Sequence, residues 1–282
     1  MTNLMALVLV ALSAEPGAGE AQMPFQAWWV DSLQQVLVEE TAPRMPPPGE
    51  LHAARGEFEA IQVAVRSSTA RRVRLAAEPF AAELPIRVRT VGRVPIVRGT
   101  HHTPKEQRVA ELPADLPDPL PPGDALDLQA DRTDCFWLDV QVPAAAKPGE
   151  YRTRIRLSSD GTSVDLPLTL HVHRATVPFE GTLLLTNWFS VRPKELGFGD
   201  APPGSDAWFA CANLLFDSMW AHRQNMFWTP LRPPFIRPVV TDGGKLDFDF
   251  TLFDAWVEAF SRPRGGSRKT YIEGQPIAWR EG

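Results

Sequence analysis

Cysteine is scarce in this sequence, and its two cysteines, Cys135 and Cys211, form no CxxC pair. Without such a pair, the chain carries no cysteine signature of a zinc or redox site. Cys135 falls in a strand-like run, whereas Cys211 falls in a helix-like run of a different predicted domain. We therefore predict two buried thiols, each packed as a small apolar residue, in preference to a disulfide.

The 282 residues also lack a basic block, a glycine-rich phosphate loop and a GxSxG motif, and their formal net charge is only -5. Proteins that follow a phosphate backbone carry clustered lysine and arginine, so we predict no nucleic-acid partner. The missing motifs leave kinase, dehydrogenase and esterase functions without support. We expect no cofactor, and the small net charge of the protein favours a neutral ligand over a nucleic acid.

Long apolar runs are absent as well, and no segment is long enough to predict a membrane span. The apolar run Leu4–Leu12 has the length of a signal-peptide core, and small residues follow it. We predict a signal peptide over residues 1–22 and hence a secreted or periplasmic protein. Because Met1–Asn3 contains no lysine or arginine, a disordered leader is the alternative.

Apolar and polar residues alternate through residues 23–178, a period typical of strands with one buried face. In Tyr151–Leu157 three arginines share the face opposite the apolar residues, and residues 164–172 repeat the alternation. Ser159–Thr162 lies between these runs and has turn chemistry, so the pair predicts a hairpin. Several such short strands predict an antiparallel β-sandwich.

The pattern changes in residues 179–282, where apolar strand-like runs alternate with helix-like segments. The predicted strands cover 182–189, 225–231 and 269–274, and the predicted helices cover 206–224 and a segment starting at Thr251, whose hydroxyl we expect to cap it. This order predicts parallel strands and a partial (β/α) barrel, which makes the fold class multidomain β plus α/β. Eight units need about 250 residues, so we expect part of a longer protein; a short α/β domain is the alternative.

Several motifs in one order resemble glycoside hydrolase family 123 and the related domain of unknown function 4091. They are Ala54–Gln62 (ARGEFEAIQ), Pro117–Leu120 (PDPL), Phe136–Pro143 (FWLDVQVP), Ala146–Tyr151 (AKPGEY), Ala221–Asn225 (AHRQN) and Tyr271–Gly274 (YIEG). The resemblance runs from about Trp28 to Glu273. It implies an N-terminal sandwich followed by a catalytic barrel.

The resemblance implies a retaining enzyme that removes terminal β-linked N-acetylgalactosamine, so the expected partner is a glycan with a terminal N-acetylhexosamine. In that family the substrate's acetamido group is the nucleophile, and a neighbouring Asp-Glu pair assists it. This sequence contains no Asp-Glu dipeptide. We therefore assign no catalytic residue and expect this chain alone to be inactive. A non-catalytic carbohydrate-binding or scaffolding protein is the alternative function.

The C-terminal ends of barrel strands hold the ligand in enzymes of this architecture. That position nominates Asn187, Trp188, Trp228 and Glu273 as substrate-binding residues. An indole can stack on the apolar face of a pyranose, and asparagine or glutamate can bond its hydroxyls. For the tryptophans, packing in the core is an equally good interpretation.

Two further groups have simpler interpretations. His171 and His173 share a strand face, but a pair without a third ligand is more typical of a solvated surface, so we predict no metal site. Asp247 and Asp249 follow a glycine-rich turn and precede the second predicted helix. We expect them to act at the start of that helix.

Overall fold

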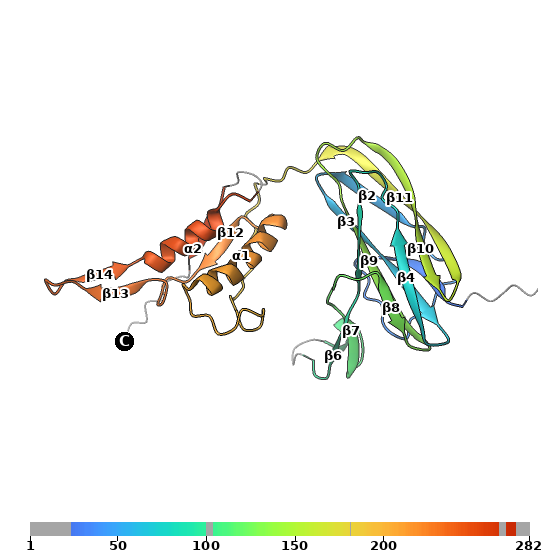
Figure 1. Ribbon diagram of the computed structural model, residues 1–282, viewed down its shortest axis with the longest axis horizontal. Coiled ribbons are helices and arrows are strands. Elements are labelled where there is room, and N and C mark those ends of the chain that lie inside the picture. Colours follow the sequence, from blue (N-terminus) through green and yellow to red (C-terminus); the bar gives the residue numbers. More distant parts are fainter. Residues whose placement is uncertain (1–23, 100–103, 181, 265–268, 275–282) are drawn as a thin grey trace, which may run out of the picture. The chain divides into compact units, whose positions relative to one another are not determined.

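The computed structural model describes residues 24–99, 104–180, 182–264 and 269–274. The chain divides into two compact units, Met1–Val177 and Pro178–Gly282 (Figure 1). The predicted signal peptide, residues 1–22, lies outside the described residues. Among the helices that are described, none combines the length and the apolar character needed to cross a membrane.

The first unit contains two sheets, with the strand orders β1-β3-β9-β5 and β2-β11-β10-β4-β8. The first sheet consists of β1 (Gln26–Asp31), β3 (Phe58–Ser67), β5 (Ile86–Thr90) and β9 (Arg132–Gln141). The second consists of β2 (Glu50–Arg55), β4 (Arg71–Ala77), β8 (Ala125–Leu128), β10 (Gly149–Ser159) and β11 (Thr162–Thr176). A ribbon of β6 (Arg93–Ile96) and β7 (Ala114–Pro117) and the short helix η1 (Lys105–Gln107) accompany them.

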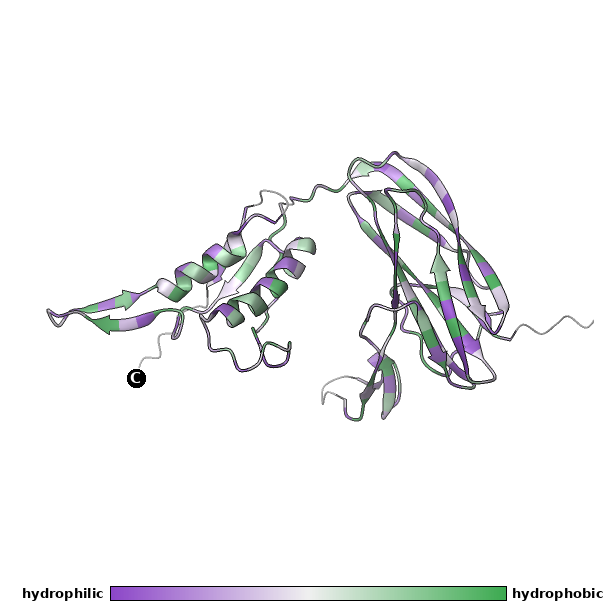
Figure 2. Ribbon diagram, viewed as in Figure 1, coloured by the Kyte–Doolittle hydropathy of each residue, from purple (hydrophilic) through white to green (hydrophobic). Residues whose placement is uncertain are grey.

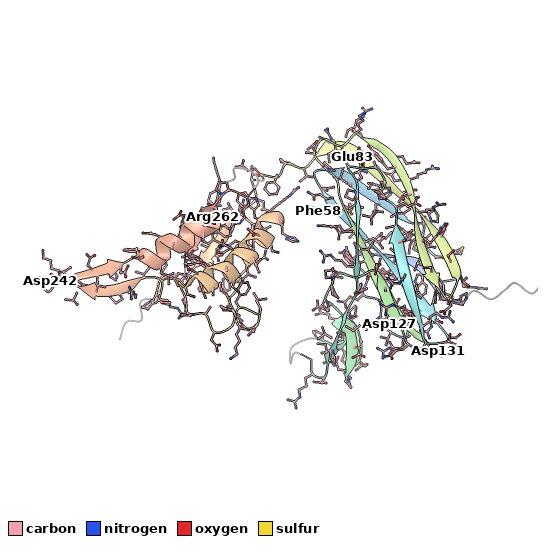
Figure 3. All side chains as sticks on the ribbon, viewed as in Figure 1. Phe58, Glu83, Asp127, Asp131, Asp242 and Arg262 are labelled. Atoms are coloured by element: carbon pink, nitrogen blue, oxygen red, sulfur yellow. The ribbon has the colours of Figure 1, made fainter. Side chains whose placement is uncertain are left out.

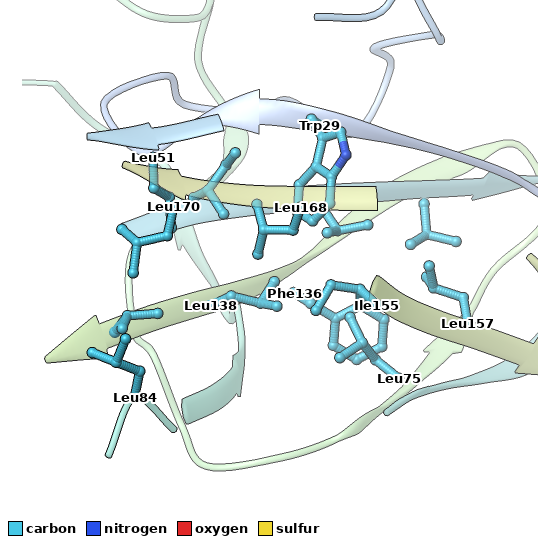
Figure 4. Close-up of a cluster of buried hydrophobic side chains, with 14 of the residues drawn as sticks. Trp29, Leu51, Leu75, Leu84, Phe136, Leu138, Ile155, Leu157, Leu168 and Leu170 are labelled. Atoms are coloured by element: carbon cyan, nitrogen blue, oxygen red, sulfur yellow. The ribbon is translucent and has the colours of Figure 1, made fainter. Parts of the chain in front are cut away.

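The inner faces of these two sheets share one hydrophobic core (Figure 4). Phe136 and Leu138 of β9 meet Ile155 and Leu157 of β10 there, and all four side chains are almost fully buried. Apolar and polar residues alternate along the strands (Figure 2), as the sequence predicts. Each such side chain stabilises the fold by roughly 1.5–3 kcal/mol relative to an exposed one.

The predicted hairpin is confirmed, because β10 and β11 pair antiparallel in register from Gly149–Val172 to Ser159–Thr162. Asp160 and Gly161 form the two-residue turn, with φ angles of 48° and 80°. Positive φ at both positions is the requirement of a type I′ turn, which matches the twist of the flanking strands.

One edge of the five-stranded sheet differs from the prediction of an antiparallel sandwich. β2 pairs with β11 in parallel, with Leu51 opposite Leu170 and His52 opposite His171. Parallel partners need a long connection between them, and here the rest of the sandwich separates the two strands in the sequence. Periodicity within a strand reports its buried face and not the direction of its neighbour, so the sequence pattern did not reveal this pairing.

The described residues of the second unit, 178–180, 182–264 and 269–274, form two helices and two strand pairs. Its elements are α1 (Asp206–Ala221), β12 (Met226–Thr229), β13 (Arg237–Val240), β14 (Leu246–Asp249), α2 (Thr251–Ser261) and β15 (Tyr271–Gly274). β12 and β15 are parallel, as predicted. Ser205 caps α1 by accepting a hydrogen bond from the backbone N–H of Trp208.

The first predicted strand of this unit, residues 182–189, is not a strand in the structure. The side chain of Asn225 takes the place of a strand partner here: its Oδ1 accepts from the N–H of Leu185 at 2.8 Å, and its Nδ2 donates to the carbonyl of Leu183 at 3.0 Å. The carbonyl of Leu185 accepts from the N–H groups of Asn225 and Met226. The segment therefore lies along the start of β12 without forming a regular ladder.

The start of α2 also differs in detail. Phe250 is the N-cap residue and its side chain makes no capping bond, so the predicted cap by Thr251 is wrong. Asp249 performs this task by accepting a hydrogen bond from the N–H of Thr251 at 2.9 Å, as its predicted role at the helix start requires. Asp249 ends the antiparallel hairpin β13–β14, whose turn carries Asp242 (Figure 3).

The two cysteines are free and buried, as predicted. Cys135 lies on β9 in the first unit, and Cys211 lies on α1 in the second. Burial raises the pKa of the Cys135 thiol to about 12. A thiol with that pKa is almost entirely protonated at neutral pH and is a poor nucleophile.

Candidate functional site

Glu273 is the centre of a polar cluster at the C-terminal end of the β12–β15 pair. Its Oε2 accepts a hydrogen bond from the hydroxyl of Thr186 at 2.8 Å. Its Oε1 accepts one from the indole N–H of Trp188 at 3.0 Å. The half-buried carboxylate thus joins β15 to the segment 186–188.

Trp228 shares a sheet face with Glu273. Phe227 is fully buried in the aromatic core of this unit, where its ring stacks on Phe260 with the centroids 3.8 Å apart. Successive side chains of a strand point to opposite faces, so Trp228 lies on the face turned away from that core. The parallel register places Glu273 beside Trp228, and both side chains therefore face away from the helices.

Trp188 presents its indole to solvent, since 76% of the residue is exposed. The bond from its N–H to Glu273 fixes the polar edge of the ring and leaves the apolar surface accessible. Core packing, the alternative interpretation of this residue, is not what the structure shows for Trp188. An oriented, exposed indole is suited to stacking against an apolar ligand face.

Asn187 turns toward a different partner. Its side-chain amide donates to Oε1 of Gln224 at 3.2 Å, and Nε2 of Gln224 donates to the carbonyls of Asn187 at 3.3 Å and Met226 at 3.0 Å. Gln224 is buried. Asn187 therefore ties the segment 186–188 to the residues that precede β12, an anchoring contact distinct from those of Glu273.

Of the four predicted site residues, Trp188 and Glu273 touch, Trp228 is the register partner of Glu273, and Asn187 anchors the segment. Their contact with a substrate stays a prediction. Thr186 and Gln224 complete the cluster and were not predicted. Thr186 is the residue directly before Asn187, and Gln224 lies within the motif Ala221–Asn225, so each had a signal in the sequence although no role was predicted for it.

A second polar cluster lies on the first unit, where β2 runs beside β11. The sequence offered His171 and His173 as a pair without a third ligand, but the structure stacks His52 on His171 with ring centroids 4.6 Å apart. Glu50 also belongs to this group, and the donor atoms of Glu50, His52 and His171 all lie within 4.8 Å of one another. His171 therefore belongs to a group of three possible donor residues that the sequence did not reveal, and His173 is not part of that group.

Comparison with solved structures finds a match in fold over most of this chain. A family 123 glycoside hydrolase from Clostridium perfringens, studied for glycolipid glycan hydrolysis, matches with a TM-score of 0.65 and 14% sequence identity over 83% of this chain and 45% of that chain. This chain has the fold of part of a family 123 glycoside hydrolase. The resemblance seen in the motifs is thereby confirmed at the level of the fold, and the chain spans less than half the length of the enzyme it matches.

Other solved structures match far less well. The PapD-like domain 7 of human CEP192 has a TM-score of 0.29 and 8% identity over 61% of this chain and 100% of that chain. A FixG-related protein from Vibrio parahaemolyticus has a TM-score of 0.28 and 4% identity over 53% of this chain and 96% of that chain. These likenesses are too low to support a functional argument. No protein-family model and no curated protein sequence matches the chain.

Proposed function

We propose that this chain is the N-terminal part of a glycoside hydrolase that removes a terminal N-acetylhexosamine from a glycan. The fold match, with its TM-score of 0.65 over 83% of the chain, is the observation that carries the proposal. The parallel β12–β15 pair supports it, because parallel strands joined through a helix are the repeating unit of a (β/α) barrel. In this proposal residues 179–282 supply the first units of that barrel.

The exposed apolar residues of the second unit agree with a barrel completed by further units. Leu183 is 76% exposed and Ile272 is 47% exposed, and both lie in the extended segments beside β12. Parallel sheets in soluble proteins are covered on both faces and bury their strands. Additional strands and helices beside these segments would remove this apolar surface from water.

The site faces the interior in such a barrel. The face of Trp228 and Glu273 points away from the helices, and the C-terminal strand ends surround the ligand. We assign Trp188 to stacking on the apolar face of a pyranose ring. A carboxylate has about four acceptor positions, so Glu273 retains sites for sugar hydroxyls beside its bonds from Thr186 and Trp188.

The chemistry itself requires groups that this sequence does not contain. In substrate-assisted hydrolysis a carboxylic acid protonates the leaving oxygen, and a neighbouring carboxylate orients the acetamido nucleophile. No Asp-Glu dipeptide occurs here. We assign the pair to a later barrel strand, and the residues described above bind and orient the sugar. The apolar run Leu4–Leu12 makes export to the periplasm or the medium part of the proposal.

The test is to isolate the native polypeptide from its source with an antibody raised against the first unit. We expect a mass well above 31.3 kDa and hydrolysis of a chromogenic N-acetyl-β-galactosaminide. In that enzyme, Trp188→Ala should raise KM up to about tenfold, because an aromatic contact is worth about 0.5–1.5 kcal/mol. Trp137→Ala, which removes a partly buried indole from the first unit, is the matched control and should leave KM unchanged.

A native polypeptide of 31.3 kDa that binds N-acetylgalactosamine without hydrolysing it would favour the alternative function, a non-catalytic carbohydrate-binding protein. Equal effects of the two tryptophan substitutions on KM would remove Trp188 from the site and leave the fold assignment intact.

A further inference from the structure

The outer face of the β2–β11 edge gathers imidazole and carboxylate groups from strands far apart in the sequence. His52 of β2 alternates with the buried Leu51 and Ala53, and His171 of β11 alternates with the buried Leu170 and Val172. The histidines are therefore on the side away from the core. The parallel register sets them directly opposite each other.

Strand spacing explains why these rings meet. Neighbouring strands lie about 4.7–4.9 Å apart, and the rings of His52 and His171 stack with centroids 4.6 Å apart and planes 12° from parallel. The ring of His173 lies 5.6 Å from that of His52. His52 is thus the imidazole that both histidines of β11 contact.

Carboxylates border this group on two sides. Glu50 is two residues before His52 on the same face of β2, and its carboxylate completes the triad whose donor atoms lie within 4.8 Å of one another. Glu150 comes from β10, on the other side of β11, and its Oε2 is 3.9 Å from Nδ1 of His171. The cluster therefore combines neutralising oxygen donors with two or three imidazoles.

We propose that Glu50, His52 and His171 form a binding site for a divalent transition-metal ion, with Zn²⁺ as the best fit. Two histidines and a glutamate are a ligand set that zinc uses in proteins, with a fourth position filled by water or another group. Imidazole selects Zn²⁺, Ni²⁺ or Cu²⁺, whereas Ca²⁺ and Mg²⁺ prefer sites made of oxygen alone. Water or the Glu150 carboxylate supplies the fourth ligand.

The geometry requires only side-chain movement. Donor atoms around a tetrahedral zinc ion stand about 3.3 Å apart, given bonds of about 2.0–2.2 Å. The donor atoms lie within 4.8 Å of one another, so each pair must approach by at most about 1.5 Å to reach the tetrahedral spacing. Rotation of the glutamate side chain and of the two imidazole rings supplies this movement. Glu50 and His52 are exposed and His171 is partly exposed, so an ion can enter from solvent.

Such an ion would join the edge strand β2 to β11 at residues 50, 52 and 171. Its binding energy would add to the stability of the folded sandwich, since a site assembled from two strands does not exist in the unfolded chain. The site belongs to the first unit and uses none of the residues assigned to glycan binding. The result of its test is therefore independent of the hydrolase proposal.

The experiment is titration of the tag-free full chain with ZnCl₂ in a calorimeter, combined with thermal unfolding with and without zinc. We expect one ion per chain and a higher Tm in zinc. His52→Ala should weaken binding at least about 100-fold, because loss of an outer-shell partner alone typically costs 10–100-fold. Glu50→Gln keeps both imidazoles and should give a smaller loss, and Co²⁺ in place of Zn²⁺ should show the visible bands of a tetrahedral site.

Two controls separate this site from the other histidines. His222→Ala removes an exposed imidazole from the end of α1, and His101→Ala with His102→Ala removes the adjacent pair in the sequence; both proteins should bind zinc as tightly as the wild type. Unchanged affinity in His52→Ala, with the fold confirmed by circular dichroism, would overturn the proposal. Equal affinity for MgCl₂ or CaCl₂ would also overturn it, because a histidine site discriminates against those ions.

Discussion

The sandwich unit buries most apolar side chains of its strands between two sheets, and exposed apolar residues such as Leu33 and Met45 lie outside those strands. The second unit gathers aromatic rings around one tryptophan and leaves apolar side chains of its strands exposed to water. In the first, Val63, Leu138 and Leu170 are at most 1% exposed. In the second, the ring of Trp256 contacts the rings of Phe189, Trp208, Phe216 and Phe235. Val240 and Leu246 of its hairpin are 73% and 66% exposed.

We predict from this difference that the first core is stable without further cover and that the second is not. Two sheets packed face to face cover each other's apolar faces, so the sandwich needs nothing further. The parallel pair β12–β15 has two faces. The aromatic core formed with the helices α1 and α2 covers only the face that carries Phe227. The sandwich should therefore fold alone, whereas the second unit should depend on additional cover.

The largest expected effect comes from separating the units. A chain of residues 24–177 should unfold cooperatively in urea with a free energy in the usual range of about 5–15 kcal/mol. A chain of residues 178–282 should show no cooperative transition. Circular dichroism and hydrogen exchange measure both, and a cooperative transition of similar size in residues 178–282 would show that the second core is also complete.

Within the sandwich, Phe136→Ala should lower the free energy of unfolding by about 3–5 kcal/mol, since a buried aromatic leaves a cavity that the close-packed core fills only in part. Phe136 is fully buried. The matched control is Phe58→Ala on β3, because Phe58 is 45% exposed (labelled in Figure 3) and contacts Arg87 through its ring face. Phe58→Ala should lower the free energy of unfolding, measured by urea denaturation, by less than about 1 kcal/mol. Similar losses in both variants would contradict the burial pattern.

The smallest effect concerns acid stability at the hairpin β13–β14. Hydrogen bonds from Thr251 and the pairing with Arg237 lower the pKa of Asp249 to about 2. An unfolded aspartate has a pKa of about 3.9, so this group stabilises the fold fully above that value and loses its contribution as the pH falls through about 2.

Urea denaturation between about pH 5 and pH 2 measures this contribution. The difference in unfolding free energy between wild type and Asp249→Asn should shrink as the pH falls. Asp242→Asn removes a carboxylate from the turn of the same hairpin (Figure 3) and should show no such trend if the contacts of Asp249 are the cause.

The sandwich faces could be predicted from sequence because alternation with period two is local. The arginines of Tyr151–Leu157 and the Asp160-Gly161 turn fix both the exposed face and the register of β10 and β11. The parallel partnership of β2 and β11 joins residues more than a hundred positions apart. No local pattern encodes it, and the contact of His52 with His171 was missed for the same reason.

In the second unit, an apolar run in the sequence did not always correspond to a strand in the structure. Residues 182–189 have the composition of a buried strand, but the side chain of Asn225 satisfies the backbone of Leu183 and Leu185 and so replaces a ladder. The hairpin β13–β14 was not predicted, although its strands are as long as the predicted strands β12 and β15. The predicted strand ends were enough to nominate Trp188 and Glu273, whereas no local pattern reveals the hydrogen bond that joins them.

The long strand β11 pairs with β10 over residues 162–172 and with β2 at residues 169–172 and 176, close to the point where the chain leaves the sandwich. The N–H of Val177 donates to the carbonyl of Arg55 at 2.8 Å, and the guanidinium of Arg55 donates to the carbonyl of Arg174 at 2.9 Å. A mechanical load arriving through Pro178 therefore reaches a strand that cannot be peeled away without rupturing ladders along both of its edges. Tension on the connection at Pro178 would therefore load the neighbouring strands β2 and β10 as well as β11.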